Sequence, residues 1–580
     1  MGKPVASPSP ILTPSSFTPG SAAVYSTKLW DERPLKYSKN VIARVCVFIF
    51  ILAVCSELTH FSVVQSLKNF FQKLGWSNKG SNSMKTTFDS ICQFACILAG
   101  YVADEKLGKF RTLLTATTMN GVGLIPVAIA ALPTVLAHLG VSKALFNIGL
   151  FVGVSLTQTC LMSLSVSFGG DQFSPTAPPE EKAKFFSIHY WAGNIGTFLA
   201  YLIFPTVSIH GIGAISAEYG YFSVYVAGFV LMLFVAALLL TTRPRYVNVP
   251  PTKDSIGVVL KVVLNRAKHN FRARMIVIGT AAYIAALVLN VPAAFLSDHG
   301  DVGRRISYCS GVLAFFGTVV WVYYGRDSSF MDGAKDTEGG EFDSEIVDGV
   351  KQVIRILPFN AFNAFWWIPD SSQIPGPTVQ GFNPLSAVFI VPLLYKVAFP
   401  LYERIVGKPA SKYGKILTGY FIAALAMFWT GVYEIIRRNA GPLTYEDAEG
   451  VSQFILNNDG HQVMNDIKWY TAIPQYFLVS LAGAFIVIPS YDICYSEVPQ
   501  RMRSTSVALS FFVMSMGSTI QSTIVLLFGK YITTDLNDGH LEYLYYGLGS
   551  IMFAVALVYI VVMNEMKLGM LPPLGKDQTK

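Results

Sequence analysis

Long apolar runs recur along almost the whole chain, and most are long enough to cross a lipid bilayer. A membrane-spanning helix needs about 20 largely apolar residues. Lipid offers the backbone no hydrogen-bond partners, so such a chain must fold as a bundle of helices. The sequence predicts about fourteen spans, at 41–64, 88–103, 112–137, 144–168, 184–208, 219–241, 273–296, 306–324, 353–370, 382–402, 413–436, 470–495, 504–529 and 542–563.

The composition agrees with a polytopic membrane protein whose environment is the lipid bilayer. The 580 residues are 52% hydrophobic and 14% charged, whereas soluble domains carry roughly 25% charged residues. The formal charge of +8 fits basic cytosolic loops, and no nucleic-acid partner is expected. All seven cysteines lie in or beside apolar runs without metal-ligand spacing, so they are expected to be buried thiols.

Loop charges predict the orientation. Lysine and arginine concentrate on the cytosolic side of membrane proteins. The segments 243–274 and 403–415 are basic and fall on one side under an even count of spans, whereas 437–468 on the other side is more acidic. Both termini are therefore expected in the cytosol. Lys68, Lys73 and their neighbours in the first loop are an exception to this assignment.

The spans group as six, two and six. This grouping is typical of a transporter built from two six-helix halves with an inserted hairpin. The expected segments are a disordered cytosolic tail (1–40), an N-terminal six-helix bundle (41–242), a basic cytosolic linker (243–272), an inserted two-helix hairpin (273–325), a cytosolic linker (326–352), a C-terminal six-helix bundle (353–564) and a cytosolic tail (565–580).

The loop between the second and third spans carries the motif GYVADEKLGKFRT, with Gly100, Asp104, Gly108, Lys109 and Arg111 at its defining positions. Glycines let such a loop turn tightly against neighbouring helices. Its acid and bases can form charge-assisted bonds that hold one conformation and break in another. The pattern resembles the loop signature of the major facilitator superfamily.

Further motifs follow in SVSFGGDQFSP (165–175), KFFSIHYWAGNIGTFLAY (184–201) and AIPQYFLVSLAGAFIVIPSYDICYSEVPQRMRS (472–504). Together they resemble the proton-coupled oligopeptide transporter family within that superfamily, over about residues 40 to 565. The resemblance implies an all-α major facilitator fold of two six-helix bundles plus a two-helix insert. It also implies secondary active transport by alternating access, with small peptides and protons as the first expectation.

The residues that recognise protons and peptides in this family are largely replaced. Where its first helix carries E-x-x-E-R, this chain has Ser56, Thr59 and His60. A lysine of the fourth span is replaced by Met162, and a glutamate of the tenth core helix is replaced by Gly483. Peptide termini buried without partners cost several kcal/mol each. A neutral or singly charged organic solute therefore fits as well as a peptide.

Glu57 and His60 stand within the first span, where ionisable residues are costly and usually functional. Their i, i+3 spacing puts them near one face of a helix, where they could pair. The proton-coupling candidates are Glu57, His60 and Asp370. The candidates for the substrate cavity are His189, Tyr190, Asn194, Trp366, Asp370, Tyr491 and Asp492. The candidates for conformational locking are Gly100, Asp104, Gly108, Lys109, Arg111, Asp171 and Gln172.

The sequence contains no enzyme signature such as HExxH, GxSxG or a P-loop. We therefore expect no catalysis, no cofactor and no metal, with a small-molecule substrate and protons as partners. Two alternatives stay open: an uncoupled or anion carrier for a non-peptide solute, and a non-transporting sensor or scaffold. The membrane is expected to be the plasma membrane or an endosomal or vacuolar membrane.

Overall fold

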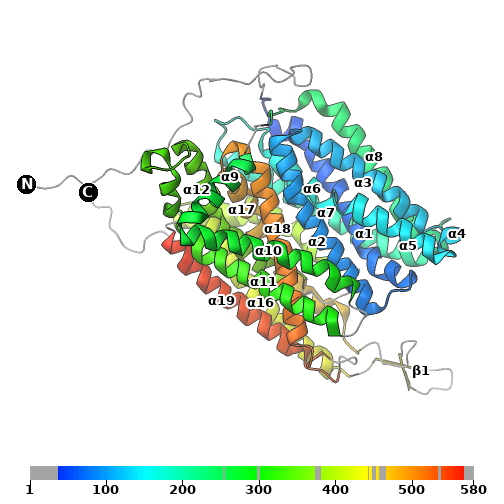
Figure 1. The fold of residues 1–580 in the computed structure, drawn as a ribbon. Coiled ribbons are helices and arrows are strands. Elements are labelled where there is room, and N and C mark those ends of the chain that lie inside the picture. The colour runs from blue at the N-terminus through cyan, green and yellow to red at the C-terminus, as the bar shows by residue number, and fades with distance from the viewer. Residues whose placement is uncertain are drawn as a thin grey trace, which may run out of the picture. The chain divides into compact units, whose positions relative to one another are not determined.

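Helices make up most of the described chain in the computed structural model (Figure 1). The structure describes residues 37–251, 255–296, 301–371, 380–441, 443–446, 452–455, 465–532 and 537–566. The first block of helices comprises η1 (Ile42–Cys46) with α1 (Val47–Lys73), α2 (Asn78–Glu105), α3 (Lys109–Ala130), α4 (Pro133–Leu136), α5 (Leu139–Ile148) with η2 (Gly149–Val154) and α6 (Gln158–Gly170), α7 (Pro179–His210) and α8 (Gly220–Thr242).

The segment between the blocks begins with a helix that the sequence did not predict, α9 (Ser255–His269). The predicted hairpin follows as α10 (Phe271–Phe295) and α11 (Asp301–Gly325). The second block comprises α12 (Ser344–Ser371), α14 (Phe382–Leu393) with η7 (Leu394–Ala398) and α15 (Phe399–Val406), α16 (Lys412–Asn439), α17 (Ile473–Ser496), α18 (Arg503–Leu527) and α19 (Leu541–Glu565). A small antiparallel pair, β1 (Thr444–Glu446) and β2 (Ser452–Phe454), lies between α16 and α17.

Thirteen stretches of the described chain are helical, long and apolar enough to cross a membrane. The remaining predicted span corresponds to α12, which is 28 residues long but is not among them. Two buried asparagines make it more polar, and both accept bonds from α17. Ser490 Oγ donates to Asn363 Oδ1 (3.3 Å) and Cys494 Sγ to Asn360 Oδ1 (3.5 Å). These partners let α12 lie inside the bundle despite its lower hydropathy.

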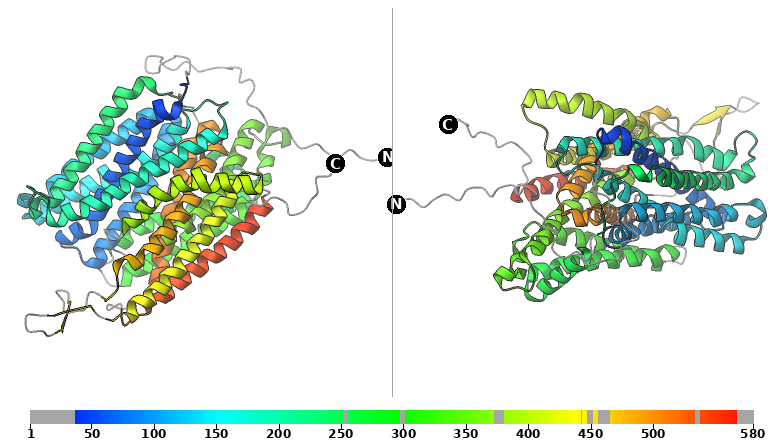
Figure 2. Two further views of the ribbon diagram at one scale, coloured as in Figure 1. Left: turned by 180° about the vertical axis from the view of Figure 1, so that it is seen from behind. Right: turned by 90° about the horizontal axis from the view of Figure 1, so that it is seen from above.

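The two blocks meet along pairs of helices that are distant in sequence. α2 and α6 pack against α18, while α7 packs against α14 and α17. In the left view of Figure 2 the blue and cyan helices of the first block lie beside the orange, yellow and red helices of the second. At Gly100 the approach is close, because an added Cβ would lie 3.0 Å from both Thr505 Cα and Ala508 Cβ. Glycine therefore sets the spacing between α2 and α18.

We call the end of the bundle at which α1 begins and α19 ends the terminal face. The alternation of the helices also brings the α2–α3, α6–α7 and α17–α18 connections to this face. The motif residues at 100–111, 171–172 and 495–505 come together there, although they lie far apart in the chain.

Candidate functional site

A carboxylate of the first block caps a helix of the second block at the terminal face. Asp104 Oδ2, in the last turn of α2, accepts hydrogen bonds from the backbone N of Thr505 (2.9 Å) and from its Oγ1 (3.0 Å). Thr505 lies in the first turn of α18, where backbone N–H groups have no partner within the helix. An acid at this position also complements the helix dipole. Asp104 therefore joins α2 to α18.

We expect Asp104→Ala to weaken the closed terminal face by about 0.5–2 kcal/mol, the usual cost of losing such a cap. Asp104→Asn should retain most of the closed population, because an asparagine oxygen can accept the same bonds. Spin labels at Lys106 and Gln500, which are exposed on opposite blocks, measure the separation. An Ala variant with an unchanged distance distribution would contradict this role for the cap.

A second contact between the blocks centres on Asp171, which is buried after the end of α6. Its carboxylate forms an ion pair with Lys109 of the first block. It also accepts hydrogen bonds from Tyr495 Oη (2.7 Å) and from Arg503 Nη1 (3.5 Å), both from the second block. Arg503 lies over the Tyr495 ring, with its guanidinium carbon 4.3 Å from the centroid, and donates to its hydroxyl (3.0 Å). Asp171 therefore ties both blocks together.

The chain that enters α1 lies beside this cluster. Burial raises the pKa of Tyr37, and the charge of Asp171 adds to the rise while Arg503 opposes it. The phenol of Tyr37 is therefore within electrostatic reach of the contact between the blocks.

The remaining predicted locking residues make contacts within the first block or with the segment that follows α8. Gln172 clamps the backbone of Val247 in both directions, with Nε2 donating to its carbonyl (3.1 Å) and Oε1 accepting from its N–H (2.8 Å). Gly108 has a φ of +77°, which favours glycine, and it starts α3. Arg111 lies half-buried in the first turn of α3. These contacts position Lys109 for its ion pair with Asp171.

Glu57 lies in the middle of the first span, buried at 5% exposure against α7. Thr197 Oγ1 donates to its Oε2 at 3.4 Å. An added Cβ at Gly193 would lie 3.5 Å from Glu57 Cγ, so the side chain runs along a small-residue surface of α7. Among the residues that the structure describes, no basic side chain lies within 4.0 Å of this carboxylate.

His60 lies about one helical turn beyond Glu57, farther from the terminal face. The structure shows no ion pair between the two side chains in the described chain. The His60 ring packs edge-on against Phe61 at 4.9 Å. Its Nδ1 is buried without a hydrogen-bond partner among the described residues. Lys85 of α2 is within electrostatic reach of the ring.

Tyr190 and Trp366 occupy the space beside Gly483 of α17. An added Cβ at Gly483 would lie 2.9 Å from the Tyr190 hydroxyl oxygen and 3.1 Å from a ring carbon of Trp366. Asn194 donates to the Tyr190 carbonyl (2.8 Å) within α7. A longer acidic side chain at 483 would therefore collide with both aromatic groups. The structure brings Tyr190 and Trp366 together at this point.

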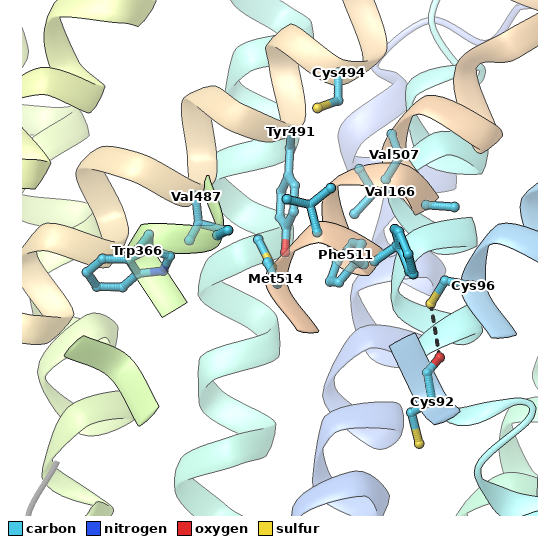
Figure 3. Packing of buried hydrophobic residues seen from close by; sticks show 14 of the residues in the cluster. Cys92, Cys96, Val166, Trp366, Val487, Tyr491, Cys494, Val507, Phe511 and Met514 are labelled. Atoms are coloured by element: carbon cyan, nitrogen blue, oxygen red, sulfur yellow. Dashed lines mark hydrogen bonds between the residues drawn. The ribbon is translucent and has the colours of Figure 1, made fainter. Parts of the chain in front are cut away.

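His189 and Tyr491 form a fully buried contact between α7 and α17. His189 Nε2 is 2.8 Å from Ser165 Oγ, and its ring lies edge-on to Tyr491 at 6.4 Å. Tyr491 stacks on Phe511 of α18, with the ring centroids 5.9 Å apart. Figure 3 shows these two side chains in the packed interior. Tyr491 is also within electrostatic reach of Glu57 and Tyr190. Tyr491 thus links the Glu57 region to the second block.

Asp492 pairs with a lysine of α16 and does not join the other candidate residues of the cavity. Asp492 Oδ2 pairs with Lys412 Nζ (2.8 Å) at the start of α16, and its Oδ1 accepts from Ser496 (2.7 Å). The structure therefore separates it from the group around Glu57 and Tyr190, and it ties α16 to α17 near the terminal face. The side chain of Asp370 lies outside the described residues.

Sequence reasoning did not include Tyr495, Arg503 and Thr505 among the locking candidates. All three lie in or beside the motif at 472–504, so a signal was present. Their partners, Asp104 and Asp171, are more than 300 residues away in the chain. A single sequence does not reveal which motifs meet across two bundles.

Comparisons with known proteins identify the family and the fold of this chain. The model of the POT family matches residues 110–298 and 350–538. Protein NRT1/PTR FAMILY 8.5 of Arabidopsis thaliana is 23% identical, over 90% of this chain and 89% of the relative. Protein NRT1/PTR FAMILY 8.2 of the same organism is 22% identical, over 91% of this chain and 94% of the relative.

Two solved structures share the fold. The POT family transporter PepTSo, in its in meso crystal structure, has a TM-score of 0.62 at 20% identity, covering 90% of this chain and 98% of that one. A POT family transporter in complex with 5-aminolevulinic acid has a TM-score of 0.56 at 15% identity, covering 90% and 96%. These findings confirm the predicted family and fold, and with thirteen apolar helices they establish an integral membrane protein. The chain therefore belongs to the POT family, whose solved members are membrane transporters.

Proposed function

We propose that this protein is a proton-coupled symporter of small peptides or related small organic solutes, and that Glu57 carries the proton. One observation supports this most directly: Glu57 is a buried carboxylate in the middle of a membrane-spanning helix, bonded to the neutral Thr197 and without a cationic partner among the described residues. An unpaired buried carboxylate is costly. Glu57 would therefore hold a proton while enclosed and release it to water when its surroundings open.

Contacts between the two blocks hold the terminal face closed. Asp104 and Asp171 each bond to residues of the other block there. We assign this face to the cytosol, because the basic segments 243–274 and 403–415 fall on it. The conformation described would then shut the route to the cytosol. Breaking the Asp104 and Asp171 contacts would open the route to the cytosol as the blocks rock.

A carrier for a solute without a free amine is a second candidate, and Gly483 favours it. The Tyr190 hydroxyl and the Trp366 ring occupy the space that an acidic side chain would need at this position. No fixed anion for a peptide amine is therefore present there. Relatives vary in what they bind, since one solved POT family transporter holds 5-aminolevulinic acid and another holds a thioalcohol-conjugated peptide.

We expect N-acetylation of a transported dipeptide to change its apparent affinity by less than about fivefold, because Gly483 offers no anion to pair with the free amine. Loss of an ion pair to the amine would instead weaken binding by about tenfold for each 1.4 kcal/mol that the pair contributes. Competition between acetylated and free dipeptides for uptake into proteoliposomes measures this. A loss of about a hundredfold on acetylation would mean that another acid recognises the amine.

The general proposal is tested by uptake into proteoliposomes with an inward-acid pH gradient, using a panel of dipeptides, tripeptides and small organic anions. Uptake that rises with the gradient supports symport, and uptake insensitive to pH supports the uncoupled carrier. Flux of none of these solutes, with partner binding retained, would support a sensor or scaffold. Comparing plasma-membrane with endosomal or vacuolar fractions of the source cell tests the expected location.

A further inference from the structure

A groove of 290 Å³ lies at the terminal face, where the inserted hairpin meets the end of α19. It is lined by Arg272, Tyr323, Tyr324, Arg326, Asp327 and Glu565. The residues come from the start of α10, the end of α11, the segment after α11 and the end of α19. None of the residues that line the groove belongs to α1, which carries Glu57. The proposed transport cycle does not use the groove.

Two guanidinium groups face this groove, and each is held by an exposed carboxylate. Arg272 Nη1 lies 2.5 Å from Asp327 Oδ2, with both side chains about half exposed. Arg326 Nη1 lies 2.5 Å from Glu565 Oε2. Exposed ion pairs of this kind contribute only about 0–1 kcal/mol. A phosphate, which arginine binds through two parallel bonds, can therefore replace either carboxylate at little cost.

Exposed aromatic rings border the groove, as is typical of side chains at the level of lipid headgroups. Phe271 is 62% exposed and Tyr323 is 58% exposed, at adjoining ends of two membrane-spanning helices. The Arg326 guanidinium carbon lies 4.4 Å from the centroid of the Tyr323 ring. Aromatic and basic side chains gather where a spanning helix leaves the hydrocarbon region. The groove therefore opens at the membrane surface.

The unpredicted helix α9 extends this basic surface. Asn270 alone separates α9 from α10, so the end of α9 must lie near the membrane. Its inner side is buried through Val262 and Val263, and Arg266 Nε anchors it by donating to the Phe330 carbonyl (2.7 Å). Its outer side exposes Leu260, Lys261, Leu264 and Lys268. A basic amphipathic helix of this kind binds anionic lipid surfaces.

The segments on this face differ in charge: 243–274 is basic, whereas 326–352, which follows α11, has eight acidic and three basic residues and a net charge of −5. The segment 243–274 contains one acidic residue, Asp254, against eight basic residues, which gives a net charge of +7. The basic residues are Arg243, Arg245, Lys253, Lys261, Arg266, Lys268, Arg272 and Arg274. Each basic residue near an anionic leaflet contributes about 1 kcal/mol of attraction.

We propose that the groove between the inserted hairpin and α19 binds the phosphate of an anionic phospholipid, with Arg272 and Arg326 as its ligands and α9 lying on the same leaflet. The ligand chemistry is a phosphate at the membrane surface, and the hairpin thereby gains a binding function separate from solute transport.

The test is lipid binding to the purified full chain in detergent, followed by native mass spectrometry or titration with short-chain phosphatidylglycerol and phosphatidylcholine. Wild type should prefer phosphatidylglycerol, and the double variant Arg272→Gln/Arg326→Gln should bind it about tenfold more weakly, as expected when charge-assisted bonds are lost. Phosphatidylcholine binding should not change. The Arg272 side chain is 52% exposed and that of Arg326 is 26% exposed, so the variant is expected to fold normally, which its thermal unfolding temperature checks.

The matched control is Arg304→Gln on the same hairpin. Arg304 also pairs with an exposed aspartate, Asp301, but at the opposite end of α11. It should leave phosphatidylglycerol binding unchanged. Equal losses in Arg304→Gln and the double variant would overturn the proposal, because general surface charge would then explain binding. Displacement of the lipid by millimolar inorganic phosphate or glycerol phosphate would also overturn it, since a soluble phosphate would then be the ligand.

Discussion

Glu57→Gln should abolish accumulation driven by a pH gradient while leaving solute exchange intact. With one proton per solute, a gradient of about one pH unit supports about tenfold accumulation, since a tenfold ratio corresponds to about 1.4 kcal/mol. Glutamine keeps the shape of the protonated side chain and can still accept the Thr197 hydroxyl bond, so the variant should fold and bind solute. The measurement compares gradient-driven uptake with counterflow in the same proteoliposomes.

The matched control is Glu403→Gln, which removes a carboxylate exposed near the end of α15 and should leave accumulation unchanged. His60→Ala and Asp370→Asn test the other predicted proton carriers. Accumulation by Glu57→Gln equal to that of wild type would reject Glu57 as the carrier. Loss of both accumulation and counterflow would instead assign Glu57 to solute binding.

Tyr495→Phe should open the terminal face without disturbing the Lys109–Asp171 pair inside the first block. The hydroxyl that it removes donates to Asp171 (2.7 Å) and accepts from Arg503 (3.0 Å). A hydrogen bond to a charged group contributes about 1.5–3 kcal/mol, so the closed population should fall by about tenfold to a hundredfold relative to the open one. The distance between labels at Lys106 and Gln500 measures the shift.

Asp171→Ala should have a larger effect, because it also leaves Lys109 buried at 7% exposure without its carboxylate. Part of that cost falls on the first block itself, so thermal stability should drop as well. Asp301→Asn, which breaks an exposed pair on the hairpin, serves as the control and should change neither quantity. If Tyr495→Phe leaves the label distance unchanged, the Tyr495–Asp171 bond does not hold the blocks together.

The helices were predictable because their apolar residues must meet lipid, and thirteen of the expected spans are present. Helix boundaries were less predictable where polar residues continue a helix. α2 starts at Asn78, ten residues before the predicted span, because Ser77 caps it by accepting from the Gly80 N–H (2.9 Å). The sequence predicts a basic linker where α9 forms, because the apolar residues of α9 are too few for a span.

The candidate site was predictable only in part. Single-helix logic put Glu57 and His60 near one face, yet the structure leaves them unpaired within the described chain, since Glu57 turns to Thr197 of α7. Asp492 is adjacent to Tyr491 in sequence but pairs with Lys412. The partner of each side chain depends on which helices pack together. That packing arises from contacts between segments that are far apart in the sequence, so the local order of residues does not reveal it.

The most direct test of the proposed symport measures proton and solute movement together. Proteoliposomes that enclose a pH-sensitive dye receive an inward gradient of a transported solute without an initial pH gradient, with the membrane potential clamped. Coupled entry predicts that the lumen of wild-type vesicles acidifies as solute enters, and that Glu57→Gln vesicles do not acidify. Solute entry with no change in luminal pH in wild type would contradict proton coupling.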